Sequence, residues 1–138
     1  MDNMEQQVWQ RVFAQPEEPR EDLMPLIYSS QELVAAYSHL AKTGGEKIKG
    51  LLKGETEILN ILKGLSRLQG RPVRLKPQPA PKESTARLLE KCFHRSVRAR
   101  REFLARSAGG EFGEVFRILA DRAGEQCGRI AEVLGMMG

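Results

Sequence analysis

The sequence predicts an all-α protein built as a four-helix bundle, with an additional short helix at its N-terminus. Three observations lead to this prediction. Apolar residues recur at helical spacing in four long segments and one short segment. Alternating β-branched runs are absent, and aromatic residues make up only 6% of the chain. Glycine pairs and one proline-rich stretch separate the periodic segments, and 138 residues with 41% apolar content suit one domain with a sizeable core.

The first predicted element is a short amphipathic helix over residues 4–14, capped by Asp2 or Asn3. Its apolar stripe consists of Val8, Trp9, Val12 and Phe13. An acidic link containing two prolines ends this helix. Because the stripe is too apolar to stay in water, it packs either across its own bundle or on a second subunit. In both cases we expect Trp9 to be buried.

The four long helices follow in chain order. The first opens near Asp22, with Pro25 tolerated in its first turn. The third begins after Ser84, because serine is favoured at helix N-caps. Each predicted helix except the last ends next to a glycine, as is common at helix C-termini. The predicted ranges are about 22–43, 46–69, 85–108 and 111–136.

The links between helices predict how the helices are connected. Two glycines join the first helix to the second and the third to the fourth, so each pair forms an antiparallel hairpin. The link over about residues 70–83 contains four prolines and spans roughly 40 Å when extended. A helix of 24 residues is about 36 Å long, so this link can cross the full length of the bundle. Residues 1–20 therefore form the N-terminal helix and its link, and residues 21–138 form the bundle.

The run Tyr37-Ser38-His39-Leu40-Ala41, followed by Glu55 in the apolar second helix, gives the best local match to a known family. On these residues the segment from Leu23 to Leu134 resembles the ferritin-like superfamily, near the small rubrerythrin-type bundles of anaerobic bacteria. The resemblance implies two hairpins joined by one long crossover and a di-iron centre with six inward ligands. A carboxylate seven residues before the tyrosine and a Glu-x-x-His motif, both repeated in the second half, supply those ligands.

Most of the implied ligand positions hold other residues in this chain. Ser30 stands seven residues before Tyr37, and Ile58 takes the histidine position after Glu55. The other positions fall on Phe93 or His94 in the third helix and on Ala123 and Gln126 in the fourth. Glu55 is thus a remnant ligand position, with His94 as the second candidate. Because one carboxylate and one imidazole meet neither the charge nor the coordination number of two cations, we expect no cofactor, with di-iron as the alternative.

Glu55 lies on an apolar stripe, and a buried carboxylate is costly unless it is paired. Its predicted partner is Arg100, and the other candidates are His94 and Gln126. Arg100 belongs to the predicted inward face of the third helix, which comprises Leu89, Phe93, Arg100 and Leu104. Such a polar layer either binds a small ligand or is a satisfied part of the core, and the sequence favours the second interpretation.

The net positive charge is concentrated in one stretch. Residues 71–106 hold eleven basic and three acidic residues, a local charge of +8, whereas the whole chain carries +4. The candidate polyanion-binding residues share one face of the third helix: Arg87, Lys91, Arg95 and Arg98, with Arg106 beyond them. Such a ridge could neutralise phosphates, but it has no interleaved aromatic residues for stacking bases. The alternative is a solvated face that meets the acidic N-terminal half or a partner subunit.

Other chemistry is not indicated. Cys92 and Cys127 are too few for a disulfide framework and are either ordinary buried thiols or a redox pair. Catalytic triads, phosphate-binding glycine loops and paired Cys-x-x-Cys motifs are missing. We expect a cytoplasmic protein without membrane attachment, because neither a secretion signal nor an apolar run of about 18 residues is present.

The sequence therefore favours a non-catalytic ferritin-like protein that has lost its di-iron ligands and acts in protein–protein association, with a protein partner or a second copy of itself. The first alternative is a di-iron oxidoreductase or metal-binding protein with irregular ligands around Glu55. The second alternative is binding of a nucleic acid or another polyanion by the basic third helix.

Overall fold

The computed structural model describes residues 22–71 and 73–137, and every regular element within these ranges is an α-helix. The helices are α2 (Met24–Ala41), α3 (Glu46–Leu68), α4 (Thr85–Ser107) and α5 (Gly113–Met137). The predicted all-α class and the four long helices are confirmed. The predicted N-terminal helix over residues 4–14, with Trp9, lies outside the described residues.

Local sequence signals account for most helix ends. Pro25 stands in the first turn of α2, where its missing N–H costs no helical hydrogen bond. The Ser84 Oγ caps α4 by accepting a hydrogen bond from the backbone N–H of Arg87 at 3.4 Å. The start of α5 at Gly113 is two residues later than predicted. Gly110 adopts a φ of 91°, so the turn between α4 and α5 extends through Phe112.

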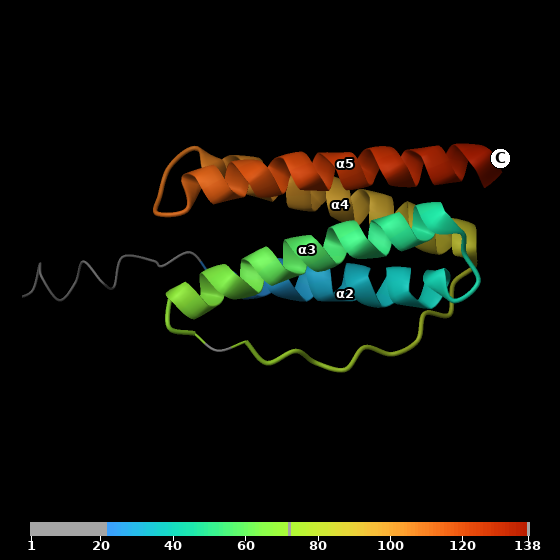
Figure 1. Cartoon of the computed structure of the whole chain (residues 1–138), viewed down its shortest axis with the longest axis horizontal. Helices are drawn as coiled ribbons and strands as arrows, with labels where there is room; N and C mark the ends of the chain where they lie inside the picture. The colour runs from blue at the N-terminus through green and yellow to red at the C-terminus, as the bar shows by residue number, and fades with distance from the viewer. Residues whose placement is uncertain (1–21, 72, 138) are drawn as a thin grey trace, which may run out of the picture.

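The helices form a bundle in which each one packs against two neighbours (Figure 1). α2 and α3 form one antiparallel hairpin, and α4 and α5 form the other. The hairpins meet where α3 packs on α5 and α2 packs on α4. It follows that α3 and α4 stand diagonally opposite each other and run in the same direction.

The proline-rich chain between α3 and α4 follows the outside of α2 in Figure 1. Gln31 Nε2 donates a hydrogen bond to the backbone carbonyl of Lys76. The Nζ of Lys76 also lies 5.3 Å from the ring centroid of Tyr28. These two contacts hold the middle of the segment against α2.

The core consists of two apolar clusters, one toward each end of the bundle. The cluster at the end where α2 begins comprises Leu23, Leu26, Ile27, Ile58, Leu59, Leu62, Leu65, Phe103, Phe116, Leu119, Ala120 and Ala123. The cluster at the other end comprises Leu33, Ala36, Tyr37, Leu40, Ile48, Leu51, Leu88, Leu89, Cys92 and Ile130. Between the two clusters the bundle is crossed by a layer of polar side chains.

The inward face of α4 is not the predicted one. Its buried residues are Leu88, Leu89, Cys92, Ser96 and Phe103. Phe93 is only half-buried, whereas Arg100 and Leu104 are exposed. If α4 turned its predicted face toward the core, the guanidinium of Arg100 would be buried. Burying a small hydroxyl at Ser96 costs far less, and this explains the rotation of the helix.

Candidate functional site

The candidate site is the polar layer at the middle of the bundle. Each helix contributes one buried polar side chain to it, and we call Ser30 of α2, Glu55 of α3, Ser96 of α4 and Gln126 of α5 the central polar layer. Each of the four is at most 3% exposed. Because polar atoms at this depth have little access to water, each must find partners inside the protein.

Glu55 is the charged member of this layer. The Ser30 Oγ donates a hydrogen bond to Glu55 Oε2 at 2.6 Å. Burial raises the pKa of Glu55 to about 7, although hydrogen bonds with Ser30 and Gln126 partly oppose the shift by favouring the carboxylate. Near neutral pH, a large fraction of the molecules therefore carry a protonated, uncharged Glu55.

Gln126 connects the layer to the surface. Its Nε2 donates to the backbone carbonyl of Leu51 at 2.8 Å, and its Oε1 accepts from Arg129 Nη1 at 2.8 Å. Gly54 makes room for this arrangement, since a Cβ there would lie 2.5 Å from Gln126 Oε1. The absence of a side chain at residue 54 thus lets the Gln126 amide lie directly against α3.

Two further polar groups, Tyr37 of α2 and Cys92 of α4, adjoin the layer. The hydroxyls of Tyr37 and Ser96 are buried close to each other, yet neither makes a hydrogen bond of normal geometry within the described part of the chain. Burial raises the pKa of Tyr37 far above its usual range, and the nearby Cys92 and Glu55 add to this shift. Burial also raises the pKa of the Cys92 thiol to about 11. Both groups therefore keep their protons at neutral pH.

The predicted pairing of Glu55 with Arg100 is wrong. Arg100 is exposed and lies across α5 at Gly124, where an added Cβ would be 3.2 Å from its Nε. His94 is also exposed and contacts the ring of Phe93 edge-on, so it does not reach the core. Of the candidate partners, only Gln126 lies beside Glu55.

Two residues of this site were missed in the sequence, although each carries a signal. Ser96 lies seven residues after Leu89 and seven before Phe103, a heptad spacing that places it on their face. Arg129 follows Gln126 by three residues, which brings the two side chains together on a helix. Ser30 was noted as a replaced ligand position, and its role as a hydrogen-bond donor became visible only in three dimensions.

The layer does not fit a di-iron centre. Among residues 22–71 and 73–137, no group of three or more His, Cys, Asp or Glu side chains is arranged to hold a metal ion. Ile58 and Ala123, which stand at ligand positions implied by the resemblance, are each 2% exposed and fill the core with apolar atoms. Hydroxyls, one amide and one carboxyl of raised pKa supply too little negative charge for two hard cations.

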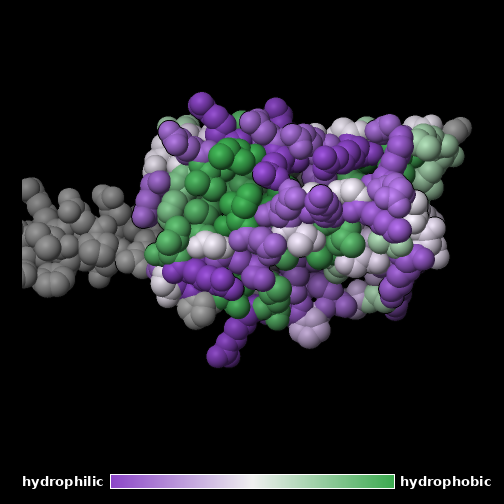
Figure 2. Space-filling view, viewed as in Figure 1, coloured by the Kyte–Doolittle hydropathy of each residue, from purple (hydrophilic) through white to green (hydrophobic). Residues whose placement is uncertain are grey.

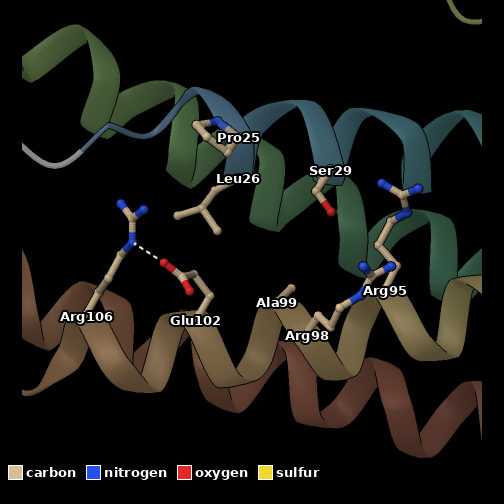
Figure 3. Close-up of a pocket in the computed structure, with 8 residues that line it drawn as sticks. All are labelled: Pro25, Leu26, Ser29, Arg95, Arg98, Ala99, Glu102 and Arg106. Carbon is tan, nitrogen blue, oxygen red and sulfur yellow. Dashed lines mark hydrogen bonds and ion pairs between the residues drawn. The ribbon is translucent and has the colours of Figure 1, made fainter.

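Two of the four predicted polyanion-binding residues are paired with acidic neighbours. Arg95 Nη2 lies 2.7 Å from Glu32 Oε2 of α2, and Lys91 pairs with Glu83. Arg98 lines a groove between α2 and α4 together with Arg95 and Arg106, as Figure 3 shows. Arg87 is exposed at the start of the same helix. The basic face thus contacts the acidic N-terminal half through the Arg95–Glu32 pair, and it also borders a groove.

The groove measures about 310 Å³ and is lined by Pro25, Leu26, Ser29, Arg95, Arg98, Ala99, Glu102 and Arg106. In Figure 3, Arg95 and Arg98 stand at one end and Arg106 at the other, with the Arg106–Glu102 ion pair along one wall. Leu26 of α2 and Ala99 of α4 add apolar atoms to its lining. The arrangement provides spaced positive charges beside apolar atoms.

No protein-family model matches the chain, and no curated protein or solved structure is significantly similar to it. None of the four described helices combines the length and the apolar composition needed to cross a lipid bilayer. The geometry of the described residues is therefore the basis for assigning a function.

Proposed function

We propose that this protein is a cytoplasmic, non-catalytic member of the ferritin-like superfamily that has lost its di-iron ligands and acts in protein–protein association. The observation that carries the proposal is the central polar layer. In it, Ser30 and Gln126 surround Glu55 with neutral hydrogen-bonding groups at positions where the superfamily keeps metal ligands.

The path of the chain supports the superfamily assignment. The two hairpins pack so that α3 and α4 are parallel and diagonal, which requires a connection along the length of the bundle. The segment held on α2 by Gln31 and Tyr28 follows such a path. One long crossover between two hairpins is the arrangement expected of a ferritin-like bundle.

The chemistry of the layer argues against redox catalysis. A di-iron centre needs several anionic oxygen ligands, whereas burial raises the pKa of Glu55, the one carboxyl group of the layer, to about 7. Its neighbours Ser30, Ser96 and Gln126 carry no charge. The hydrogen bonds of Ser30, Glu55 and Gln126 instead form a polar network in the core, which selects one packing of the four helices over others.

A role in association is supported by the surface. Large apolar side chains of the described residues that are more than 40% exposed include Leu75, Leu104, Met136 and Met137. Burying such side chains against a partner removes apolar surface from water and stabilises the complex. A protein whose core holds no reactive centre but whose surface keeps this apolar area suits a binding role.

Elemental analysis tests the loss of the metal. The full chain is purified without chelators, and iron and manganese are measured per chain before and after incubation with Fe(II). We expect far less than one metal per chain, with no difference between the natural protein and a Glu55→Gln variant. Stoichiometric metal that disappears in Glu55→Gln would instead establish the metal-binding or oxidoreductase alternative.

Sedimentation velocity tests self-association. We expect a mass above the 15.5 kDa of one chain, rising with concentration. A strictly monomeric protein would contradict homo-oligomer formation and restrict the proposal to a heterologous partner.

The arginine-lined groove favours polyanion binding as a second candidate function. Arg95, Arg98 and Arg106 place three guanidinium groups along one groove, and guanidinium groups recognise phosphate well. Retention on duplex DNA or heparin at low salt, falling steeply as salt rises, is the expected result. Arg98→Ala should weaken this retention, whereas lack of retention even at low salt would reject this function.

A further inference from the structure

The outer seam between α3 and α5 is polar along one half. Lys47 of α3 pairs with Glu132 of α5. Further along, Arg122 Nη1 lies 2.6 Å from Glu57 Oε2. These two cross-helix pairs establish an antiparallel register that can be followed, one helical turn at a time, into the other half of the seam.

The other half of the seam is apolar. One turn beyond the Glu57–Arg122 pair, the facing positions are Ile61 and Ile118. The apolar half-seam comprises Ile61, Gly64 and Leu68 of α3, Val115 and Ile118 of α5, and Phe112 in the turn before α5. Ile118 is 51% exposed and Leu68 is 77% exposed. Figure 2 shows apolar side chains gathered on this face near the end of the bundle where α2 begins.

The shape of the apolar half-seam suits a helix. Gly64 has no side chain, and a Cβ added there would meet nothing within 4 Å, so a docked side chain could approach the backbone of α3 closely. Partly buried Ile61 and Val115 pack on the core beneath it. Amphipathic helices bind such grooves through residues spaced by three or four along one face.

We propose that the N-terminal stripe of the same chain, Val8, Trp9, Val12 and Phe13, docks in the apolar half-seam as an amphipathic helix. The four residues are spaced as a groove-binding face requires. The segment carries no cluster of positive charge that would instead direct it to an anionic lipid surface. Docking within one chain would therefore remove both the stripe and the half-seam from water.

The place where the described chain begins supports this occupant. Arg106 Nη1 donates to the backbone carbonyl of Asp22 at 3.2 Å, and the Arg106 guanidinium lies 5.8 Å from the ring centroid of Phe116. Asp22 is therefore held at the end of the bundle that carries the apolar half-seam. Asp22 lies on the α2/α4 side, so a helix docked outside α3 and α5 is about two helix-packing distances of 8–10 Å away. The eight residues 14–21 extend to roughly 25 Å, which covers that path across the end of the bundle. The stripe can therefore reach the half-seam of its own chain.

The tether also favours the same chain over a second copy. A short link keeps the stripe at an effective concentration in the millimolar range near the half-seam. A second copy in solution would have to reach that concentration to compete. Docking within one chain is consequently expected to be independent of protein concentration.

Trp9 provides a direct probe, since it is the one tryptophan of the chain. In the full-length protein we expect blue-shifted Trp9 emission that is protected from acrylamide and does not change on dilution. Ile118→Lys places a charge in the apolar half-seam and should reduce the ratio of docked to undocked protein about tenfold, the loss expected when one aliphatic side chain is no longer buried. The Trp9 emission should then shift to the red and become quenchable.

Met137→Lys is the matched control, because Met137 is 49% exposed on the same helix at the opposite end of the bundle. This variant should leave Trp9 emission unchanged, and the far-ultraviolet circular dichroism of both variants should match that of the natural protein. Phe13→Ser, which alters the stripe and leaves the bundle intact, should reproduce the effect of Ile118→Lys.

Three outcomes would overturn the proposal. The first is water-like Trp9 emission in the natural protein, and the second is protected emission that Ile118→Lys leaves unchanged. The third is protection that disappears on dilution together with a fall in mass by light scattering, which would show that a second copy provides the docking surface.

Discussion

Replacing Glu55 by glutamine should remove a pH dependence that the buried carboxyl builds into the stability of the protein. Glutamine has the same shape and keeps a carbonyl oxygen to accept the hydrogen bond from Ser30, but it carries no charge at any pH. The variant therefore imitates the protonated form of Glu55. Any difference between the variant and the natural protein that depends on pH reports the cost of ionising this side chain in the core.

The size and sign of the effect follow from the two pKa values. Burial raises the pKa of Glu55 to about 7 in the folded protein, compared with 4.5 for an ordinary glutamate. The folded state holds this proton more tightly than the unfolded chain does. The corresponding stabilisation is complete below pH 4.5 and is lost as the pH rises through about 7. With 1.36 kcal/mol for each pKa unit, the loss between pH 5 and pH 8 is about 2.5 kcal/mol.

Urea unfolding followed by circular dichroism at pH 5, 6, 7 and 8 measures this quantity. The natural protein should lose about 2.5 kcal/mol more than Glu55→Gln between pH 5 and pH 8, so that the variant is the more stable protein at pH 8. Glu90→Gln is the control, because Glu90 is exposed on α4. Parallel pH profiles for the natural protein and Glu55→Gln would refute the argument, since they would mean that Glu55 ionises as easily in the fold as in water.

Two further predictions concern packing and thiol access. Gly54→Ala should lower the free energy of unfolding by about 1–3 kcal/mol, because its Cβ would displace Gln126 from Leu51. Gly50→Ala, whose Cβ would meet nothing within 4 Å, should raise that free energy by up to about 1 kcal/mol, and equal effects in urea unfolding would contradict the packing argument. Cys127, which is half-buried, should react with a thiol reagent in the native protein, whereas Cys92, buried and with a pKa of about 11, should react only on unfolding. Mass spectrometry of labelled peptides measures which cysteine has reacted. Labelling of Cys92 in the native protein would contradict the prediction.

Much of the fold was predictable because its signals are local. Pro25 and Ser84 mark helix starts through backbone chemistry that acts within one turn. Glu55 was correctly placed in the core, because its apolar neighbours recur at helical spacing along α3. Of the apolar residues at the implied ligand positions, Ile58 and Ala123 are buried, whereas Phe93 is only half-buried.

The partners of Glu55 could not be predicted in the same way. Two faces of α4 carry apolar residues, one with Arg100 and one with Ser96, and the periodicity of the helix alone does not choose between them. The choice depends on the cost of burying a guanidinium compared with a hydroxyl in a space that three other helices define. The predicted pairing with Arg100 failed for this reason.

The sequence by itself determined the helical class, the helix ends, the hairpin turns and the burial of Glu55, because each of these depends on residues close together in the chain. Only the tertiary structure decided that Ser30 and Gln126 provide the partners of Glu55 and that the α3/α5 seam is polar in one half and apolar in the other. These features depend on the rotation and register of helices that meet across the bundle. The packing of the whole core sets the rotation and register of the helices. The sequence of one helix taken alone therefore does not determine them.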